Sequence, residues 1–217
     1  MVIKIGNSPE SWGITGPSEL DQSPWRRCLD EIAEAGYGYL ELGPYGYLPT
    51  DPVVLRREMA QRGLGISAGA ILASLEDEDG WPDIKKEALI TGELLSSVGA
   101  TFLVVVDGFY RYKTGQELAP AVLGENSWKR LIDATHRLGN LVSDQFDLQL
   151  ALHPCADTHV QYEDQITQFL SDTDPSLVTL CLDTGHHAYR FGDPAAFMRK
   201  YHDRIGYLHL KSVDSKI

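Results

Sequence analysis

Short apolar runs alternate with amphipathic stretches along the whole chain, and this alternation limits the fold more than any other feature. The apolar runs have the length of strands, and the stretches between them place apolar residues at helical spacing. Strand-like runs lie at 2–6, 39–42, 65–69, 102–106, 148–152, 178–182 and 205–210. Helical patterns lie at 25–35, 51–62, 83–98, 128–142, 163–170 and 194–201. Strands and helices that alternate in this way are typical of parallel βαβ units.

The order of these units favours a TIM (β/α)8 barrel within the α/β class. No Pro- or Ser-rich linker divides the strands and helices, so the sequence predicts a single domain over residues 1–217. A doubly wound sheet is the competing architecture, and it often carries a GxGxxG phosphate loop after its first strand. Here the first turn, residues 6–13, reads GNSPESWG and lacks that pattern. The unbroken run of units favours the barrel.

The number of strands leads to an expectation about the natural protein. A closed barrel of this kind has eight strands in about 250 residues. Only seven strands are evident in the 217 residues. We expect that the C-terminal strand and helix are missing after Ile217, or that a partner chain covers the open edge of the sheet. Intact-mass measurement of the native protein tests this expectation. A mass near 24.1 kDa for a soluble monomer that still binds metal stoichiometrically would contradict it.

Composition and charge narrow the classes of function. The formal net charge is -12, and an acidic surface repels phosphate backbones, so we expect no nucleic-acid partner. No run of eighteen apolar residues is present, so we expect no membrane partner. Three scattered cysteines without a CxxC pair, and a start without a signal-peptide pattern, indicate a reduced cytoplasmic setting. These properties leave room for a homo-oligomer.

Ionisable residues gather where the predicted strands end, which is where barrel enzymes carry their chemistry. A carboxylate and two imidazoles from consecutive strands make a good divalent-cation site, so we predict His153, Asp183 and His209 as metal ligands. Each alone has a simpler interpretation: a histidine there is more often structural, and Asp183 alone could cap the helix that follows. Glu41 and Asp107 also end predicted strands. Residues 76–79, EDED, form an acidic loop that we expect to be solvated.

Two motifs near the C-terminus carry a family resemblance. Residues 182–186, LDTGH, are followed by DRI at 203–205 and LHLK at 208–211. This pattern resembles the sugar-phosphate isomerase/epimerase superfamily of xylose-isomerase-like barrels. Residues 41–49, ELGPYGYLP, and 7–12, NSPESW, look most like its inosose (2-keto-myo-inositol) dehydratase branch. The resemblance covers nearly the whole chain.

The resemblance implies a divalent metal, Mn, Co, Mg or Zn, held at the ends of the fifth to eighth strands. Carried over to this sequence, the ligands are His153, Asp183 and His209, and the glutamate of the eighth strand has no counterpart. Cys155 stands where the branch has a second histidine, and Lys211-Ser212 departs from the commoner Lys-Asp. No base lies near Cys155 in the sequence pattern, so we do not expect a cysteine nucleophile.

The implied activity is that of a metal-dependent lyase or isomerase on a small sugar or polyol ketone. A metal-polarised carbonyl acidifies the adjacent C–H, and a nearby carboxylate or imidazole removes the proton. We expect His186 to contact substrate or act as an acid, Lys211 to stabilise an enolate and Glu41 to bind substrate hydroxyls. We expect Trp12 and Asp107 to contact substrate. A non-catalytic sugar-binding barrel and an apurinic-endonuclease-like metal hydrolase are the alternatives.

Overall fold

The fold is built on one sheet of seven parallel strands. A computed structural model describes residues 3–18, 21–111, 115–214 and 216. The strands follow one another in the order β1 to β7, and each is hydrogen-bonded to the next strand along the chain. They are β1 (Gly6–Asn7), β2 (Tyr39–Glu41), β3 (Gly65–Ala73), β4 (Phe102–Asp107), β5 (Gln149–His153), β6 (Val178–Asp183) and β7 (Ile205–His209).

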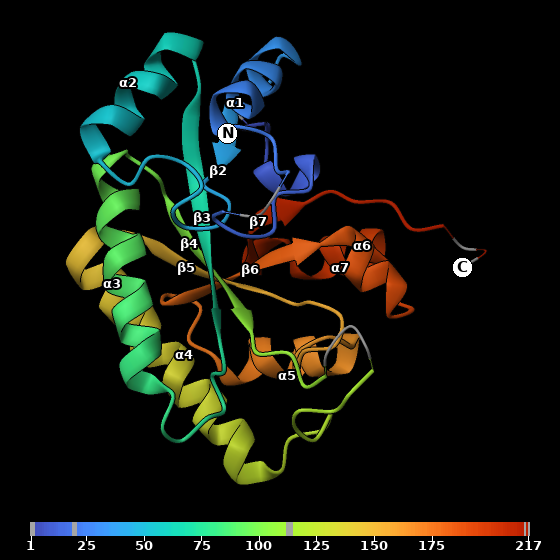
Figure 1. The fold of residues 1–217 in the computed structure, drawn as a ribbon. Coiled ribbons are helices and arrows are strands. Elements are labelled where there is room, and N and C mark those ends of the chain that lie inside the picture. The colour runs from blue at the N-terminus through green and yellow to red at the C-terminus, as the bar shows by residue number, and fades with distance from the viewer. Residues whose placement is uncertain (1–2, 19–20, 112–114, 215, 217) are drawn as a thin grey trace.

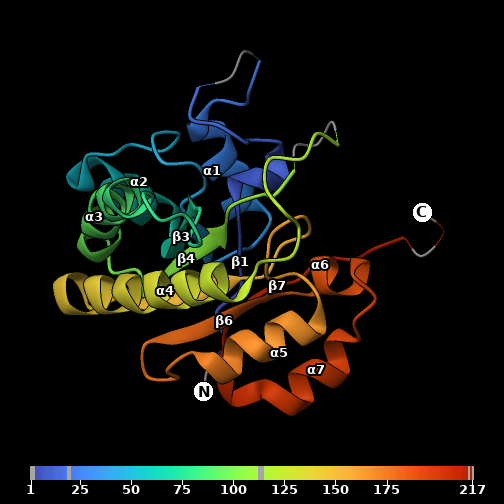
Figure 2. The same ribbon diagram turned by 90° about the horizontal axis from the view of Figure 1, so that it is seen from below.

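The helices lie outside the curl of this sheet, as Figures 1 and 2 show. They are α1 (Trp25–Glu34), α2 (Pro52–Arg62), α3 (Trp81–Ser97), α4 (Glu125–Phe146), α5 (Glu163–Asp172), α6 (Thr184–Tyr189) and α7 (Pro194–Tyr201), with short 3-10 turns η1 (Pro9–Trp12) and η2 (His202–Arg204). A doubly wound sheet reverses its strand order, whereas these strands run in sequence order around the curl. The prediction of a TIM-barrel-like α/β fold is therefore confirmed.

Alternate residues of the strands pack on opposite faces of the sheet. In β4, Leu103 and Val105 join the large core beneath the helices, whereas Val104 joins a small cluster inside the curl. That inner cluster contains Ala68, Val104, Ala151 and Cys181, all fully buried. Both faces of the strand are covered, which explains its unbroken apolar sequence.

Helix α2 begins and ends at residues that are typical of helix boundaries. Asp51 accepts hydrogen bonds from the backbone of Val53 and Val54, and Pro52 opens α2. Gly63 ends the same helix at a positive φ of 65°. Among the described residues, no helix is long and apolar enough to cross a membrane.

Two local expectations differ from the structure. The first strand comprises only Gly6–Asn7, and Ile3 and Ile5 are exposed outside it, while Val2 of the predicted range 2–6 lies outside the described residues. β1 pairs only with β2 in the described structure, so few hydrogen bonds support a longer strand there. The short helix α6 is absent from the predicted helical patterns, because it is too brief to show a helical period, although the sequence allowed Asp183 to cap a helix here.

Candidate active site

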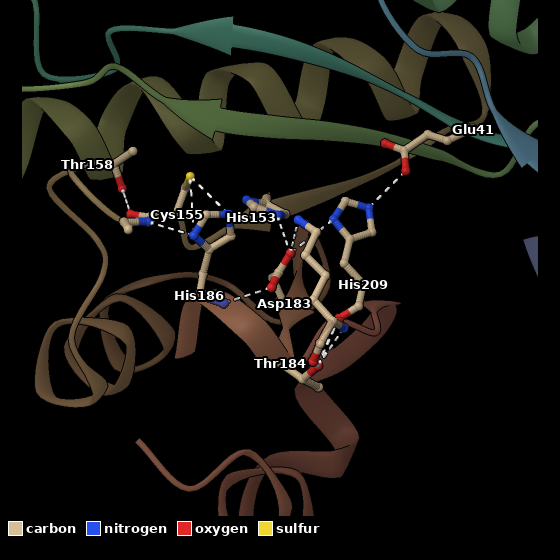
Figure 3. Close-up of polar contacts among 10 residues, drawn as sticks. Glu41, His153, Cys155, Thr158, Asp183, Thr184, His186 and His209 are labelled. Carbon is tan, nitrogen blue, oxygen red and sulfur yellow. Dashed lines mark hydrogen bonds and ion pairs between the residues drawn. The ribbon is translucent and has the colours of Figure 1, made fainter. Parts of the chain in front are cut away.

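The three predicted metal ligands lie together at the carboxyl ends of three neighbouring strands. His153 ends β5, Asp183 ends β6 and His209 ends β7. Asp183 Oδ2 lies 3.4 Å from His153 Nε2 and 3.7 Å from His209 Nδ1. The two imidazole rings are 4.8 Å apart between centroids, and Figure 3 shows both turned toward the carboxylate. The sheet register explains the convergence, since Asp183 and His209 are paired positions of β6 and β7.

Asp183 uses its two carboxylate oxygens differently. Oδ1 accepts a hydrogen bond of 2.8 Å from the backbone of His186 and so caps α6. Oδ2 faces the histidines and accepts a hydrogen bond of 2.5 Å from Lys211 Nζ. Burial would raise the pKa of Asp183, but the hydrogen bonds from His153, His209 and Lys211 outweigh it and hold the pKa well below its usual range. Asp183 therefore carries a negative charge at neutral pH at the centre of the cluster.

Glu41 fixes the orientation of the His209 ring. Glu41 ends β2, and its Oε2 accepts a hydrogen bond of 2.8 Å from His209 Nε2. This contact leaves Nδ1 as the nitrogen that faces Asp183 (Figure 3). Burial would lower the pKa of His209, but the hydrogen bonds to Asp183, Cys181 and Glu41 prevail and raise it. A metal bound at Nδ1 would therefore displace a proton from His209.

The Asp-Thr-Gly segment lets Lys211 approach Asp183 closely. Thr184 Oγ1 accepts a hydrogen bond of 2.9 Å from the backbone of Lys211 and lies 2.8 Å from the Lys211 carbonyl oxygen. A Cβ atom on Gly185 would lie only 2.7 Å from the Lys211 Cβ. Thr184 and Gly185 thus hold the end of β7 against the start of α6. This geometry explains why the motif has a threonine at position 184 and a glycine at position 185.

His186 and Cys155 face one another beside the cluster. Cys155 Sγ lies 3.5 Å from His186 Nε2, and His186 Nδ1 accepts a hydrogen bond of 3.2 Å from the backbone of Ala156. Burial lowers the pKa of His186 to about 4 and raises the pKa of Cys155 to about 11. At neutral pH the pair is a neutral imidazole and a thiol, so it lacks the thiolate that a cysteine nucleophile needs. The sequence did not indicate their proximity, because it depends on the path of the loop after β5.

The low pKa of His186 predicts how acid affects stability. The pKa of His186 is lower in the folded protein than its unfolded value of about 6.5. Its contribution to stability is therefore fully present when the pH is above about 6.5, and it is lost as the pH falls toward the folded pKa. The free energy of unfolding of the metal-free protein should therefore fall between pH 6.5 and pH 4. The His186→Gln variant should lose less over the same interval, as urea unfolding at several pH values measures. Equal losses in both proteins would contradict the assignment.

Two groups of side chains could hold a metal ion in the described residues. The donor atoms of His153, Asp183 and His186 lie within 4.8 Å of one another, and so do those of Glu76, Asp107 and His159. The first group contains His186 in place of the predicted ligand His209, whose Nδ1 lies 3.7 Å from Asp183 Oδ2. The second group was not predicted, because nothing in the strand pattern marks His159.

The two residues expected to contact substrate lie in other contacts. Trp12 belongs to η1, and its indole nitrogen donates a hydrogen bond of 2.5 Å to Glu31 of α1. Asp107 ends β4, is 1% exposed and accepts a hydrogen bond of 2.9 Å from His159 Nδ1. Neither contact joins them to the cluster around Asp183, and their roles with substrate stay predictions.

Comparisons with known proteins agree with this architecture. An inosose dehydratase of Clostridium beijerinckii is 30% identical over 99% of this chain and 72% of its own length. A probable 3-DHS dehydratase, AsbF, of Bacillus anthracis superposes with a TM-score of 0.78 at 13% identity, over 98% of this chain and 74% of the other. An L-ribulose 3-epimerase gives a TM-score of 0.77 at 20% identity, over 97% and 70% of the two chains. The two solved structures confirm the fold alone.

The family assignment depends on the sequence match, which extends over most of the chain. The family described as xylose isomerase-like TIM barrels matches residues 29–217. The matched region includes every strand from β2 to β7 and all the residues of the cluster around Asp183. This chain belongs to the family of xylose isomerase-like TIM barrels.

Proposed function

We propose that this protein is a divalent-metal-dependent lyase or isomerase that acts on a small sugar or polyol ketone. The observation that carries the proposal is the convergence of His153, Asp183 and His209 around one buried carboxylate oxygen. Inosose dehydratases among the relatives favour a keto-inositol as substrate, and a reaction that begins when a nearby carboxylate or imidazole takes a proton from the carbon beside the carbonyl.

The donor set suits a divalent metal such as Mn, Co, Mg or Zn. Asp183 Oδ2, His153 Nε2 and His209 Nδ1 would hold it, and His186 is a further nitrogen donor within reach. Lys211 is half exposed on a flexible side chain, so it can leave Asp183 Oδ2 when a cation binds there. A bound ion would supply Lewis acidity to the ketone oxygen of the substrate.

The side chains around these ligands have distinct proposed roles. Lys211 would donate to the oxyanion that develops when the proton is removed, because its ammonium group already lies beside the carboxylate. When it is not bound to the metal, neutral His186 carries its proton on Nε2, because Nδ1 accepts a backbone hydrogen bond, and it can donate a hydrogen bond from Nε2 to the hydroxyl that leaves. Glu41 would hold His209 in place and bind a substrate hydroxyl with its remaining lone pairs.

We expect the protein to work in a reducing, cytoplasmic setting on a small molecule. Cys28, Cys155 and Cys181 are all buried free thiols, which supports a reducing compartment. The net charge of -12 disfavours a nucleic-acid partner.

Turnover assays test the proposal. The purified full-length protein, stripped of metal and reloaded with Mn²⁺, should convert 2-keto-myo-inositol with loss of water or isomerise a ketose. Mass spectrometry of the products distinguishes the two reactions. Dehydration lowers the mass of the product by one water molecule, whereas isomerisation leaves the mass unchanged. Stoichiometric metal with no turnover of keto-inositols or ketoses would instead indicate a sugar-binding barrel.

A further inference from the structure

Glu76, Asp107 and His159 form a second polar cluster, which the proposed function does not use. Glu76 lies in the loop after β3, Asp107 ends β4, and His159 lies in the loop after β5. These three strands are consecutive neighbours in the sheet, so their carboxyl ends lie at one edge of the curl (Figure 1). We call these three residues the Glu76 cluster.

The donor atoms of the Glu76 cluster have the spacing of ligands around one ion. His159 Nδ1 lies 2.9 Å from Asp107 Oδ2 and 3.8 Å from Glu76 Oε2. All three donor atoms lie within 4.8 Å of one another. A zinc ion with bonds of about 2.0–2.2 Å to oxygen and nitrogen has neighbouring ligand atoms roughly 3–3.6 Å apart. A small inward movement of Glu76 would complete such a set.

The charge of the cluster is not balanced by the protein. Asp107 is 1% exposed and His159 is 2% exposed. Glu76 Oε2 is buried and makes no hydrogen bond within the described part of the chain. No lysine or arginine among the described residues forms an ion pair with either carboxylate. Contrary to our expectation for residues 76–79, Glu76 therefore turns inward, away from solvent.

A proton alone does not resolve this imbalance. If His159 carries a proton on Nδ1, it satisfies Asp107, but a second buried carboxylate remains without a counter-charge. Even a fully protonated imidazole leaves one net negative charge among the three groups. A divalent cation with a neutral imidazole gives zero net charge. Burial, together with the nearby Asp107, also raises the pKa of Glu76.

We propose that Glu76, Asp107 and His159 form a second divalent-cation site that takes Zn²⁺ or a similar borderline ion. One imidazole nitrogen and two carboxylate oxygens suit such ions, and the remaining positions would be filled by water. The site has a structural role, because it joins the loops after β3, β4 and β5. The loop after β5 also carries Cys155 and Ala156, which contact His186. The second ion would thus hold the wall of the site around Asp183.

Zinc binding in an Asp183→Ala background isolates the second site. The full-length protein and its variants are stripped with chelator, loaded with Zn²⁺, freed of excess ion by gel filtration and analysed for bound metal. We expect Asp183→Ala to retain one Zn²⁺ per chain. Adding Glu76→Gln should lower the affinity for this remaining Zn²⁺ by at least about tenfold. Glu78 is an exposed residue of the same loop, so adding Glu78→Gln should leave the affinity for Zn²⁺ unchanged.

A second measurement covers a variant that folds poorly. Zn²⁺ should raise the melting temperature of Asp183→Ala, and this increase should be lost with Glu76→Gln and kept with Glu78→Gln. Asp183→Ala with no bound Zn²⁺, or Glu76→Gln with unchanged affinity, would overturn the proposal. Neither result depends on turnover: one Zn²⁺ in both the unmodified protein and Asp183→Ala would support the second site and count against the site around Asp183.

Discussion

Replacing Asp183 with alanine is expected to remove the divalent ion held with His153 and His209 and to abolish most of the activity. Oδ2 of Asp183 is the shared partner of both imidazoles and of Lys211, so its removal leaves three basic groups facing one another. A metal that polarises a carbonyl contributes several kcal/mol to transition-state stabilisation, which corresponds to a loss of about 10³-fold or more in kcat/KM. Metal analysis and initial rates measure the two effects.

Asp193 provides a matched control for this substitution. Asp193 caps α7 through the backbone of Ala196, as Asp183 caps α6 through the backbone of His186. Asp193→Ala therefore removes a helix cap of the same kind, at a cost of about 1 kcal/mol, without touching the cluster. It should keep wild-type metal content and rate. The comparison is made in a Glu76→Gln background, in which the second site is disabled. Equal metal content with and without Asp183→Ala in that background would refute the metal site at Asp183.

Replacing Lys211 with methionine is expected to lower kcat by about 10²–10³-fold, the usual loss when one donor to a developing oxyanion is removed. The same change should leave metal affinity unchanged or increase it. Lys211 Nζ lies 2.5 Å from Asp183 Oδ2, so its ammonium group competes with a cation for that oxygen. A loss of turnover without a loss of metal binding would distinguish a catalytic lysine from one that only holds the fold.

Lys200→Met is the control, because Lys200 is exposed on α7, where its ammonium group lies 4.8 Å from the centre of the neighbouring Tyr201 ring. It should change neither kcat nor metal affinity. If Lys211→Met loses metal and activity together, then Lys211 supports the site structurally, and the proposed role at the oxyanion is wrong. Steady-state rates and metal titrations on the same preparations separate these outcomes.

The sequence predicted the parts of the fold that depend on regular periods. Apolar strands and amphipathic helices are local patterns, so strand order and most helices followed from them. The convergence of His153, Asp183 and His209 also followed, because parallel strands in a barrel place their carboxyl ends together. The two interpretations of Asp183, helix cap or ligand, proved compatible, since one oxygen caps α6 and the other faces the histidines.

The loops could not be predicted in this way. Cys155, Asp157 and His159 lie in a stretch without a period, and Asp157 takes a positive φ of 70° that redirects the chain. This path brings Cys155 to His186 and His159 to Asp107. Glu76 was assigned to a solvated loop because its neighbours are acidic, yet it points toward His159. Contacts between loops of different βα units depend on the curl of the sheet, which no local pattern encodes.

Anomalous diffraction from crystals of the full-length protein loaded with Mn²⁺ tests the central claim most directly. The account predicts a peak at about 2.0–2.3 Å from Asp183 Oδ2, His153 Nε2 and His209 Nδ1, with Lys211 displaced from the carboxylate. Glu41 should still accept the hydrogen bond from His209 Nε2. A fully loaded crystal with no peak at this position, and with Lys211 still bound to Asp183, would contradict the account.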